Sequence, residues 1–478
     1  MPMRCEWVER SMASHALGPD HFTAGWYAPT GGSGMVTLRL RGGSPLRGTV
    51  RAGGRKNSAV AVLPAALLAT GPVRLDNLPG NTDVATMVAL VRDLGVRVVP
   101  DGTGALWVDA TTLGSVEVHH TRAGRLRASY YLLGALLARC GEARVPLPGG
   151  CEIGVRPIDQ HIKGLRAMGA EVEIAHGTVT ARASHLVAAH IYLDVTSVGA
   201  TINLMLAASR AEGVTVIENA AKEPHVADVA TLLQAMGVSV VGAGTDAIKV
   251  RGQARVHGCQ HTIIPDEIEA ATYLIAAAVT GGDVTVDGVI PRHLEPVSAK
   301  LREVGAQVTE DGEALRVQGP DRPRAVNVKT LPYPGFPTDA QQPMTALLAC
   351  ARGVSTVTEN IWDGRFRFVD ELLRMGARIR VDGRSAIVTG VPELQGAVVS
   401  ATDLRGGAAL ALAGLCARGE TELRDAEHLE RGYEAFAAKL SRLGADIRRT
   451  GPSEEADALW AAEEGGGLAA ASAAAGGA

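Results

Sequence analysis

The sequence predicts an α/β (α+β) protein of two similar lobes, each built from three βαβ-type units, with a cleft between the lobes. Three observations lead to this fold class. The chain has 478 residues, of which 46% are hydrophobic, so it is too long for one ordinary domain and apolar enough to bury large cores. One helix–glycine–strand phrase occurs six times, and a second, Ala/Leu-rich phrase alternates with it.

The first phrase is the end of an amphipathic helix, a hydrophobic residue followed by glycine, and a short alternating strand. VRDLGVRVV and LQAMGVSVV are two of its copies. The glycines stand at spacings of 74, 68, 68, 71 and 68 residues, at Gly95, Gly169, Gly237, Gly305, Gly376 and Gly444. A unit of about 70 residues is longer than ordinary solenoid repeats and large enough for a βαβ-type fold. Six units divide most simply into three plus three.

The second phrase is an Ala/Leu-rich helix, a glycine and a strand, as in ALLARCGEARVPLP (135–148) and LAASRAEGVTVIENAA (206–221). These helices are apolar nearly all round, which predicts that they are buried inside each lobe. Each glycine is predicted to cap its helix at the C-terminal end. Cys140, Cys350 and Cys416 belong to such stretches and are predicted to be small core residues.

Composition excludes several classes of protein. The net charge of −4 disfavours a nucleic-acid scaffold, and no run of apolar residues is long enough for a membrane span. The first 34 residues lack the apolar core of a signal peptide, so a cytoplasmic location with reduced, unpaired cysteines is expected. Residues 1–34 and 451–478 lie outside the repeats and are predicted to be a disordered extension and a disordered Ala/Gly tail.

Stretches that break the repeat are the candidate functional sites. In GGRKNSAVAV, Lys56 and Asn57 open an apolar helix, either as an anion-binding cradle or as a solvated lysine beside an Asn cap. In PLPGGCEIGVRP, Cys151 lies among glycines and close to Arg156, which favours a reactive thiol on a mobile loop. In FPTDAQQP, Asp339 is either a general base or a helix cap.

Arginines occur in several of the same breaks, and arginine forks match carboxylates and phosphates. These arginines are Arg127, Arg365, Arg367, Arg405 and Arg431. The sequence has no HExxH metal motif, no Walker A motif and no dinucleotide fingerprint after a first strand. A thiol, a carboxylate, a lysine and several arginines therefore predict chemistry without a metal or cofactor on a small anionic substrate.

The motifs KNSA, LRAS, LPGGCxIGxRPID, SVGAT, IENAAKEP, FPTD, TDLR and RGYE stand in this order between about Met35 and Arg448. By these motifs the chain resembles the enolpyruvyl transferases, in particular the UDP-N-acetylglucosamine 1-carboxyvinyltransferases of peptidoglycan synthesis. The resemblance implies two lobes, each an inside-out α/β barrel of three units. It implies a catalytic lobe of residues 35–55 plus 265–450 and a second lobe of residues 56–264 that carries the Cys151 loop.

The resemblance also implies a reaction: the enolpyruvyl group of phosphoenolpyruvate passes to the 3-hydroxyl of the sugar nucleotide and phosphate leaves, without a metal, cofactor, membrane or nucleic-acid partner. Asp339 is implied to take the proton of the hydroxyl, and Cys151 to protonate the methylene carbon or to help release product. Lys56 and Arg431 complete the implied catalytic set. The implied substrate-binding residues are Asn57, Arg127, Arg156, Pro157, Asp159, Ser197, Val198, Gly199, Asp363, Arg365 and Arg405.

Departures from the family pattern lie on the side of the acceptor. WDG (362–364) stands where many relatives have FEN, Val195 where some have lysine, and Gln160 where an apolar residue is usual. One alternative is therefore a paralogue that enolpyruvylates another uridine nucleotide, such as UMP. A second is a catalytically idle binder of cell-wall precursors, and the shikimate-pathway relative is a third. The resemblance also predicts that the epoxide fosfomycin alkylates Cys151.

Overall fold

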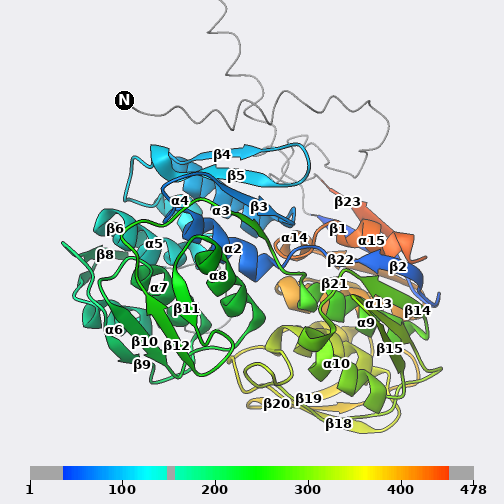
Figure 1. Cartoon of the computed structure of the whole chain (residues 1–478). Helices are drawn as coiled ribbons and strands as arrows, with labels where there is room; N and C mark the ends of the chain where they lie inside the picture. Colours follow the sequence, from blue (N-terminus) through cyan, green and yellow to red (C-terminus); the bar gives the residue numbers. More distant parts are fainter. Residues whose placement is uncertain (1–35, 148–156, 452–478) are drawn as a thin grey trace, which may run out of the picture.

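The structure, a computed structural model, describes residues 36–147 and 157–451 (Figure 1). The predicted disordered extension and nearly all of the predicted tail lie outside these residues, as do Cys151 and Arg156. The buried apolar side chains form two separate clusters. One runs from Ala59 to Ile263, and we call this part the continuous lobe. The other joins Val36–Ala52 to Ala270–Ile447, and we call it the split lobe.

The continuous lobe holds three sheets in the part of the chain that the structure describes. In spatial order their strands are β13 (Gln260–Thr262), β3 (Val73–Asp76), β5 (Leu106–Asp109) and β4 (Arg97–Pro100); β6 (Glu142–Pro146), β8 (Thr178–Arg182) and β7 (Glu171–Ala175); and β11 (Ser239–Val241), β12 (Ala247–Arg251), β10 (Val214–Glu218) and β9 (His190–Tyr192). Its helices are α2 (Lys56–Ala66), α3 (Thr82–Asp93), α4 (His120–Ala123), α5 (Tyr131–Cys140), α6 (Asp159–Ala167), α7 (Val198–Ala208) and α8 (Pro224–Ala235), with short 3₁₀ turns η1 (Ala110–Thr112) and η2 (Arg127–Tyr130).

The split lobe repeats this plan with three four-stranded sheets in the described residues. Their strands are β21 (Val398–Ser400), β22 (Glu420–Arg424), β1 (Thr37–Arg41) and β23 (Asp446–Thr450); β15 (Gln307–Asp311), β16 (Ala314–Gln318), β14 (Asp283–Asp287) and β2 (Arg47–Arg51); and β17 (Val328–Lys329), β18 (Val354–Thr358), β20 (Ser385–Thr389) and β19 (Arg378–Asp382). Its helices are α9 (Glu267–Thr280), α10 (Pro291–Glu303), α11 (Gln341–Ala349), α12 (Val369–Arg374), α13 (Leu404–Cys416), α14 (Glu427–Glu430) and α15 (Phe436–Arg442), with the 3₁₀ turn η3 (Thr338–Ala340).

Six sheets in the described residues confirm the predicted fold of two lobes with three units each. Each sheet mixes parallel and antiparallel pairs except the three-stranded one; β13 runs parallel to β3, for example, and β5 antiparallel to it. Figure 1 shows the blue strands β1 and β2, from the start of the chain, among green and orange elements of its second half. They pair there with β22, β23 and β14. The lobe boundaries inferred from resemblance stay a prediction, which the two separate cores support.

The Ala/Leu-rich helices are buried, as their composition predicts. In α13 every residue from Arg405 to Leu415 is buried, and α9, α11 and α13 pack against one another. In the continuous lobe, α5 packs against α7 and α2. Small side chains permit this close packing: a Cβ added at Gly134 of α5 would lie 2.2 Å from the Asn203 side chain of α7. The buried helices thus form the middle of each lobe and fix where their N-terminal ends point.

The glycine and cysteine predictions are confirmed in part. All six glycines of the first phrase have a positive φ, between 85° and 102°, which other residues rarely adopt. In the second phrase Gly141 and Gly281 are helix C-caps. The prediction was wrong for the other four copies, with Gly71, Gly213, Gly353 and Gly419, because their helices end before the glycine, with C-caps at Leu67, Ser209, Cys350 and Ala417. At the end of α7, the hydroxyl of the C-cap residue Ser209 donates to the Leu206 carbonyl at 2.7 Å.

Cys140 was also predicted wrongly, since its position is exposed. It is the last residue of α5, at the point where Gly141 turns the chain away from the core. Cys350 is buried as predicted and Cys416 is half-buried. Among the described helices none is both long and apolar enough to cross a bilayer.

Candidate active site

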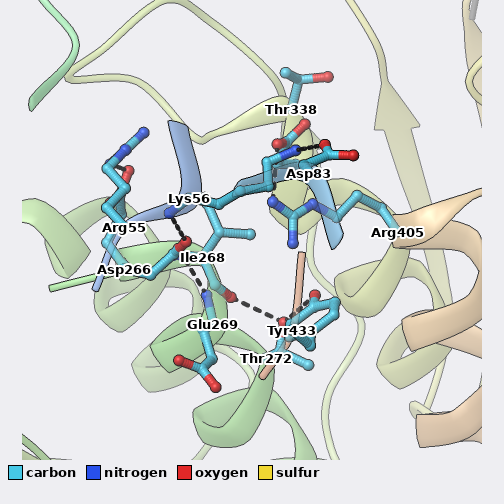
Figure 2. Close-up of polar contacts among 12 residues, drawn as sticks. Arg55, Lys56, Asp83, Asp266, Ile268, Glu269, Thr272, Thr338, Arg405 and Tyr433 are labelled. Carbon is cyan, nitrogen blue, oxygen red and sulfur yellow. Dashed lines mark hydrogen bonds and ion pairs between the residues drawn. The ribbon is translucent and has the colours of Figure 1, made fainter. Parts of the chain in front are cut away.

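The two lobes are joined where the chain crosses between them, and Lys56 lies at this crossing. Gly54 forms an isolated β-bridge with Pro265, and the Arg55 amide donates to the Ile264 carbonyl at 2.8 Å. One carboxylate then serves two helices, as Figure 2 shows: Asp266 accepts from the Lys56 amide at 3.1 Å and caps α9 by accepting from the Ile268 and Glu269 amides. The backbone of Lys56 is thereby fixed to the split lobe, although its helix belongs to the continuous lobe.

The Lys56 ammonium donates to the Asp83 carboxylate at 3.0 Å. Asp83 lies in the first turn of α3, whose N-cap is Asn81. Its other oxygen accepts from Arg431 Nε at 3.1 Å, and Arg431 comes from the C-terminal end of α14 in the split lobe. A single buried carboxylate therefore holds two predicted site cations from different lobes.

Asp339 is placed between two arginines of the split lobe. Its Oδ1 accepts from Arg365 Nη2 at 2.7 Å and its Oδ2 from Arg405 Nη2 at 3.2 Å. It lies in η3, and α11 begins after it with Ala340 at the N-cap position and no side-chain cap. The carboxylate thus does not cap the helix, so the cap interpretation was wrong, and the general-base role of Asp339 stays a prediction.

Neighbouring polar contacts hold this arrangement. Glu359 accepts from the hydroxyls of Thr330 and Thr338, both at 2.9 Å, and Arg365 Nη1 donates to the Thr338 carbonyl at 3.3 Å. Arg405 is in the first turn of α13, where the Asp403 carboxylate accepts from its amide at 2.9 Å. Its guanidinium lies over the Tyr433 ring at 5.2 Å, and the Tyr433 hydroxyl bonds to that of Thr272 at 2.8 Å.

The positive surroundings dominate the protonation of Asp339. Burial alone raises the pKa of its carboxyl, but the charges of Arg405, Arg365 and Lys56 outweigh burial and hold the pKa well below its usual range. Burial also lowers the pKa of Arg405, yet Tyr433 and Asp339 raise it above its ordinary value overall. In the structure as it stands, Asp339 is a carboxylate and Arg405 a guanidinium at any physiological pH.

The two buried arginines retain hydrogen-bonding capacity. Among the described residues, Nε of Arg365 and both Nε and Nη1 of Arg405 have no hydrogen-bond partner. Both side chains are only 4% exposed. Buried cationic donors without partners are costly, and an anionic ligand with several oxygens would supply the missing acceptors.

Arg127 reaches the same junction from the continuous lobe. It belongs to η2, and its guanidinium lies 5.8 Å from the ring centre of Tyr130 and 6.0 Å from that of Trp362 in the split lobe. The unusual tryptophan of the WDG stretch therefore faces a predicted substrate-binding arginine. The neighbouring Asp363 does not join this group, because its exposed carboxylate pairs with Arg384 at 3.5 Å.

The predicted nucleotide-binding segments form the beginnings of two helices. Ser197 caps α7 by accepting from the Ala200 amide at 3.3 Å, and Val198 and Gly199 form its first turn. A Cβ at Gly199 would lie 2.8 Å from the Tyr130 hydroxyl, so a larger residue there would displace that side chain. Asp159 opens α6 and accepts from Gln160 at 2.7 Å, while Pro157 before it is exposed.

The acceptor-side departures differ in their surroundings. Gln160 is buried and also bonds to Asp194, donating to its carboxylate at 3.1 Å and accepting from its amide at 2.9 Å. Val195, which follows Asp194 in the chain, is 60% exposed. Asn57 lies in the first turn of α2, where Arg55 and not Asn57 holds the N-cap position.

Sequence reasoning missed two charged residues at the junction. Asp83 is one; the LPGNTD stretch identifies a helix start but gives no sign that the carboxylate faces Lys56. Arg55 is the other: it is buried and paired with the Glu267 carboxylate across the crossing. Burial and the nearby charge of Arg55 lower the pKa of buried His225 well below its ordinary value. The described residues contain no cluster of side chains that would hold a metal ion.

Comparison with known proteins identifies the family. A family model described as EPSP synthase (3-phosphoshikimate 1-carboxyvinyltransferase) matches residues 40–440. This chain belongs to the enolpyruvyl transferase family. It is 58% identical over 415 residues to UDP-N-acetylglucosamine 1-carboxyvinyltransferase 3 of Caldanaerobacter subterraneus subsp. tengcongensis, covering 87% of this chain and 99% of that protein. A protein of the same name from Symbiobacterium thermophilum is 57% identical over 415 residues, which cover 87% of this chain and 98% of that protein.

Solved structures of enolpyruvyl transferases share the fold. The enolpyruvyl transferase NikO from Streptomyces tendae superimposes with a TM-score of 0.79 at 29% identity, covering 88% of this chain and all of that one. An EPSP synthase from Acinetobacter baumannii gives 0.68 at 20% identity, with 87% of this chain covered, and shows the likeness of fold alone.

The ion pairs of Asp339 make a prediction about acid stability. Because its pKa is depressed in the folded protein, Asp339 stabilises the fold above its unfolded pKa of about 3.9, and this stabilisation is lost as the pH falls toward the folded value. Asp339→Asn should lower the free energy of unfolding at pH 7 by about 3–5 kcal/mol, the usual cost of removing one partner from a buried ion pair. Urea unfolding followed at pH 7, 4 and 3 should show the gap between the two proteins narrowing with acid.

Asp363→Asn is the matched control, since this carboxylate is 79% exposed and its ion pair is long. The control should change the stability by less than about 0.5 kcal/mol at any of these pH values. An Asp339→Asn effect as small as that of the control, or one that grows with acid, would contradict the assignment of the ion pairs.

Proposed function

We propose that the protein transfers the enolpyruvyl group of phosphoenolpyruvate to the 3-hydroxyl of UDP-N-acetylglucosamine and releases phosphate, the first committed step of peptidoglycan synthesis. The observation that carries the proposal is the match to proteins named for this acceptor, at 57–58% identity over 415 residues. The likeness to the transferase NikO is much lower, at 29% identity. The fold alone does not choose an acceptor.

The charge at the lobe junction supports a phosphorylated, carboxylated donor. Asp83 pairs with Lys56 and Arg431. Asp339 pairs with Arg365 and Arg405. The spare donors of Arg365 and Arg405 match a carboxylate or phosphate that carries several acceptor oxygens. Bound there, phosphoenolpyruvate would present its double bond beside Asp339.

Binding of that donor would also prepare Asp339 for proton transfer. Its pKa is low because Arg405, Arg365 and Lys56 surround it. An anion bound to the same cations neutralises part of their field, and this raises the pKa of Asp339 toward the range in which a general base works well. The Asp339 carboxylate then takes the proton of the sugar 3-hydroxyl while the oxygen of that hydroxyl attacks C2 of phosphoenolpyruvate.

The reaction then proceeds by addition and elimination. A proton is added to the methylene carbon, for which we propose Cys151 as the donor on the strength of the family motif. The tetrahedral intermediate carries both the sugar oxygen and the phosphate on C2. Loss of a methyl proton and of phosphate regenerates the double bond, and the surrounding cations stabilise the charge of the leaving phosphate.

The acceptor side rests on the helix starts of the continuous lobe. The N-terminus of α7, with Ser197, Val198 and Gly199, presents backbone N–H groups of the kind that bind phosphate. Arg127 adds a cation, and its contact with Trp362 places an aromatic ring of the split lobe beside it. We propose that Asn57, Arg156, Pro157, Asp159 and Asp363 complete the nucleotide and sugar contacts.

Phosphate release from phosphoenolpyruvate, measured with UDP-N-acetylglucosamine, UMP and shikimate 3-phosphate in turn, tests the acceptor. We expect release with the UDP-sugar alone. Asp339→Asn should lower kcat by about 10²–10⁴-fold, the usual contribution of a positioned base. Glu117→Gln is the control and should have a far smaller effect, because this carboxylate is 67% exposed, pairs with Arg144 at 3.7 Å and belongs to no proposed contact. Release only with UMP would reject the proposed acceptor, and no release with any acceptor would reject the transferase activity in this protein.

Fosfomycin tests the proposed role of Cys151 without turnover. The resemblance predicts that this epoxide alkylates the thiol once, so the intact mass of the protein should rise by one fosfomycin. The adduct should be absent in Cys151→Asp. Cys259→Ser is the control and should still form the adduct, because burial raises the pKa of the wild-type Cys259 thiol to about 11 and makes it a poor nucleophile. An unmodified wild-type protein, or an adduct on a different cysteine, would exclude Cys151 as the reactive thiol.

A further inference from the structure

Two cysteines of the split lobe face each other on adjacent buried helices. Cys350 is the C-cap residue of α11 and Cys416 is the last residue of α13. Their sulfur atoms lie 3.5 Å apart, although 66 residues separate them in the sequence. Within residues 36–147 and 157–451 the other two cysteines, Cys140 and Cys259, have no such thiol contact. Neither cysteine of the pair belongs to the catalytic arrangement described above.

The placement of the pair follows from the direction of the two helices. Asp339, just ahead of α11, and Arg405, in the first turn of α13, are in contact at one end. The thiols meet at the other end, so the helices run side by side in the same direction. At 1.5 Å per residue, the thiols lie roughly 15 Å from the Asp339–Arg405 contact. A covalent bond between them would join the two helices that carry these groups.

The chemistry of the two thiols is unequal. Either sulfur can donate the hydrogen bond between the two thiols, and this contact, with the nearby charge of Arg322, lowers the pKa of Cys350 despite burial. The same hydrogen bond, together with burial, raises the pKa of Cys416. Arg322 is held in place by donating to the Cys350 carbonyl at 3.1 Å and the Ala351 carbonyl at 3.2 Å. The guanidinium of Arg322 beside Cys350 favours Cys350 as the nucleophile of the pair.

We propose that Cys350 and Cys416 form a redox-active dithiol site, which takes a two-electron oxidant of the peroxide class and closes a disulfide between α11 and α13. The Cys350 thiolate attacks one peroxide oxygen, the O–O bond breaks, and Cys350 becomes a sulfenic acid while hydroxide leaves. The Cys416 sulfur then attacks the Cys350 sulfur, the S–O bond breaks, and the hydroxyl group leaves with the Cys416 proton as water. In sum, two thiols and one hydrogen peroxide yield one disulfide and two waters.

Access and distance both permit this reaction. Cys350 as a residue is 9% exposed and Cys416 is half-buried, so the pair lies near the protein surface, from which the proposal requires hydrogen peroxide to reach the sulfurs. Closing the bond requires the sulfurs to approach from 3.5 Å to about 2.05 Å, a shift within reach of side-chain rotation and slight helix adjustment.

Peptide mapping of the full, folded chain tests the site and does not depend on the proposed transferase activity. The reduced protein is treated with hydrogen peroxide, quenched with N-ethylmaleimide in denaturant and digested with trypsin without reductant. Cleavage after lysine and arginine places Cys350 in peptide 330–352 and Cys416 in peptide 406–418. We expect these two peptides to appear joined, lighter than their sum by two hydrogens, and to separate on reduction.

Single variants separate the roles of the two sulfurs. Cys416→Ser should leave a sulfenic acid on Cys350 that dimedone traps, whereas Cys350→Ser should leave Cys416 as an unmodified thiol. Cys259→Ser is the matched control and should still give the joined peptides. The wild-type protein carries the main result, so a variant that fails to fold does not remove the test. Joined peptides that appear only in urea, or that pair either cysteine with another one, would overturn the proposal.

Discussion

The active arrangement depends on one buried carboxylate that two lobes share. Asp83 binds the Lys56 ammonium of its own lobe and the Arg431 guanidinium of the other, at 3.0 and 3.1 Å. Residues 348 positions apart in the sequence thereby become neighbours. Without a carboxylate at this position, two cations from opposite lobes would face each other, and their repulsion would oppose the approach of the lobes. The site therefore exists only where both lobes meet.

The same charges explain why the site suits an anion. Lys56, Arg365, Arg405 and Arg431 outnumber the two carboxylates that bind them, Asp83 and Asp339. Asp266, another carboxylate close by, accepts backbone N–H groups at the starts of two helices, and Glu267 is paired with Arg55. The surplus of positive charge holds Asp339 ionised and leaves arginine donors without partners, and an anionic donor substrate relieves both conditions. Binding of the anionic donor substrate therefore also activates Asp339 as a base, because both effects come from the same cations.

The sequence alone predicts the six repeat units of the fold, but it does not predict the ion pairs that join the two lobes. Six recurring glycines in the left-handed conformation and six apolar helices reveal the six units, because backbone geometry and burial leave a local pattern. Of the predicted site residues, the structure brings these to the lobe junction: Lys56, Arg127, Asp339, Arg365, Arg405 and Arg431. Asp83 and Arg55 escaped notice because their partners, Arg431 and Glu267, come from the other lobe. Asp363 is predicted from its motif, and the structure shows its exposed carboxylate beside Arg384, so a contact to the substrate stays a proposal. Such contacts between distant segments leave no local pattern in the sequence.

A double-mutant cycle on Asp83 and Arg431 tests the shared carboxylate most directly. kcat/KM for phosphoenolpyruvate is measured for wild type, Asp83→Asn, Arg431→Gln and the double variant. Because the two side chains contact each other across the lobes, the account predicts that the double variant loses less than the sum of the single losses, with a coupling energy of about 1–3 kcal/mol. If the loss in the double variant equals the sum of the two single losses to within about 0.5 kcal/mol, the two groups act independently, and Asp83 does not join the lobes in the way described.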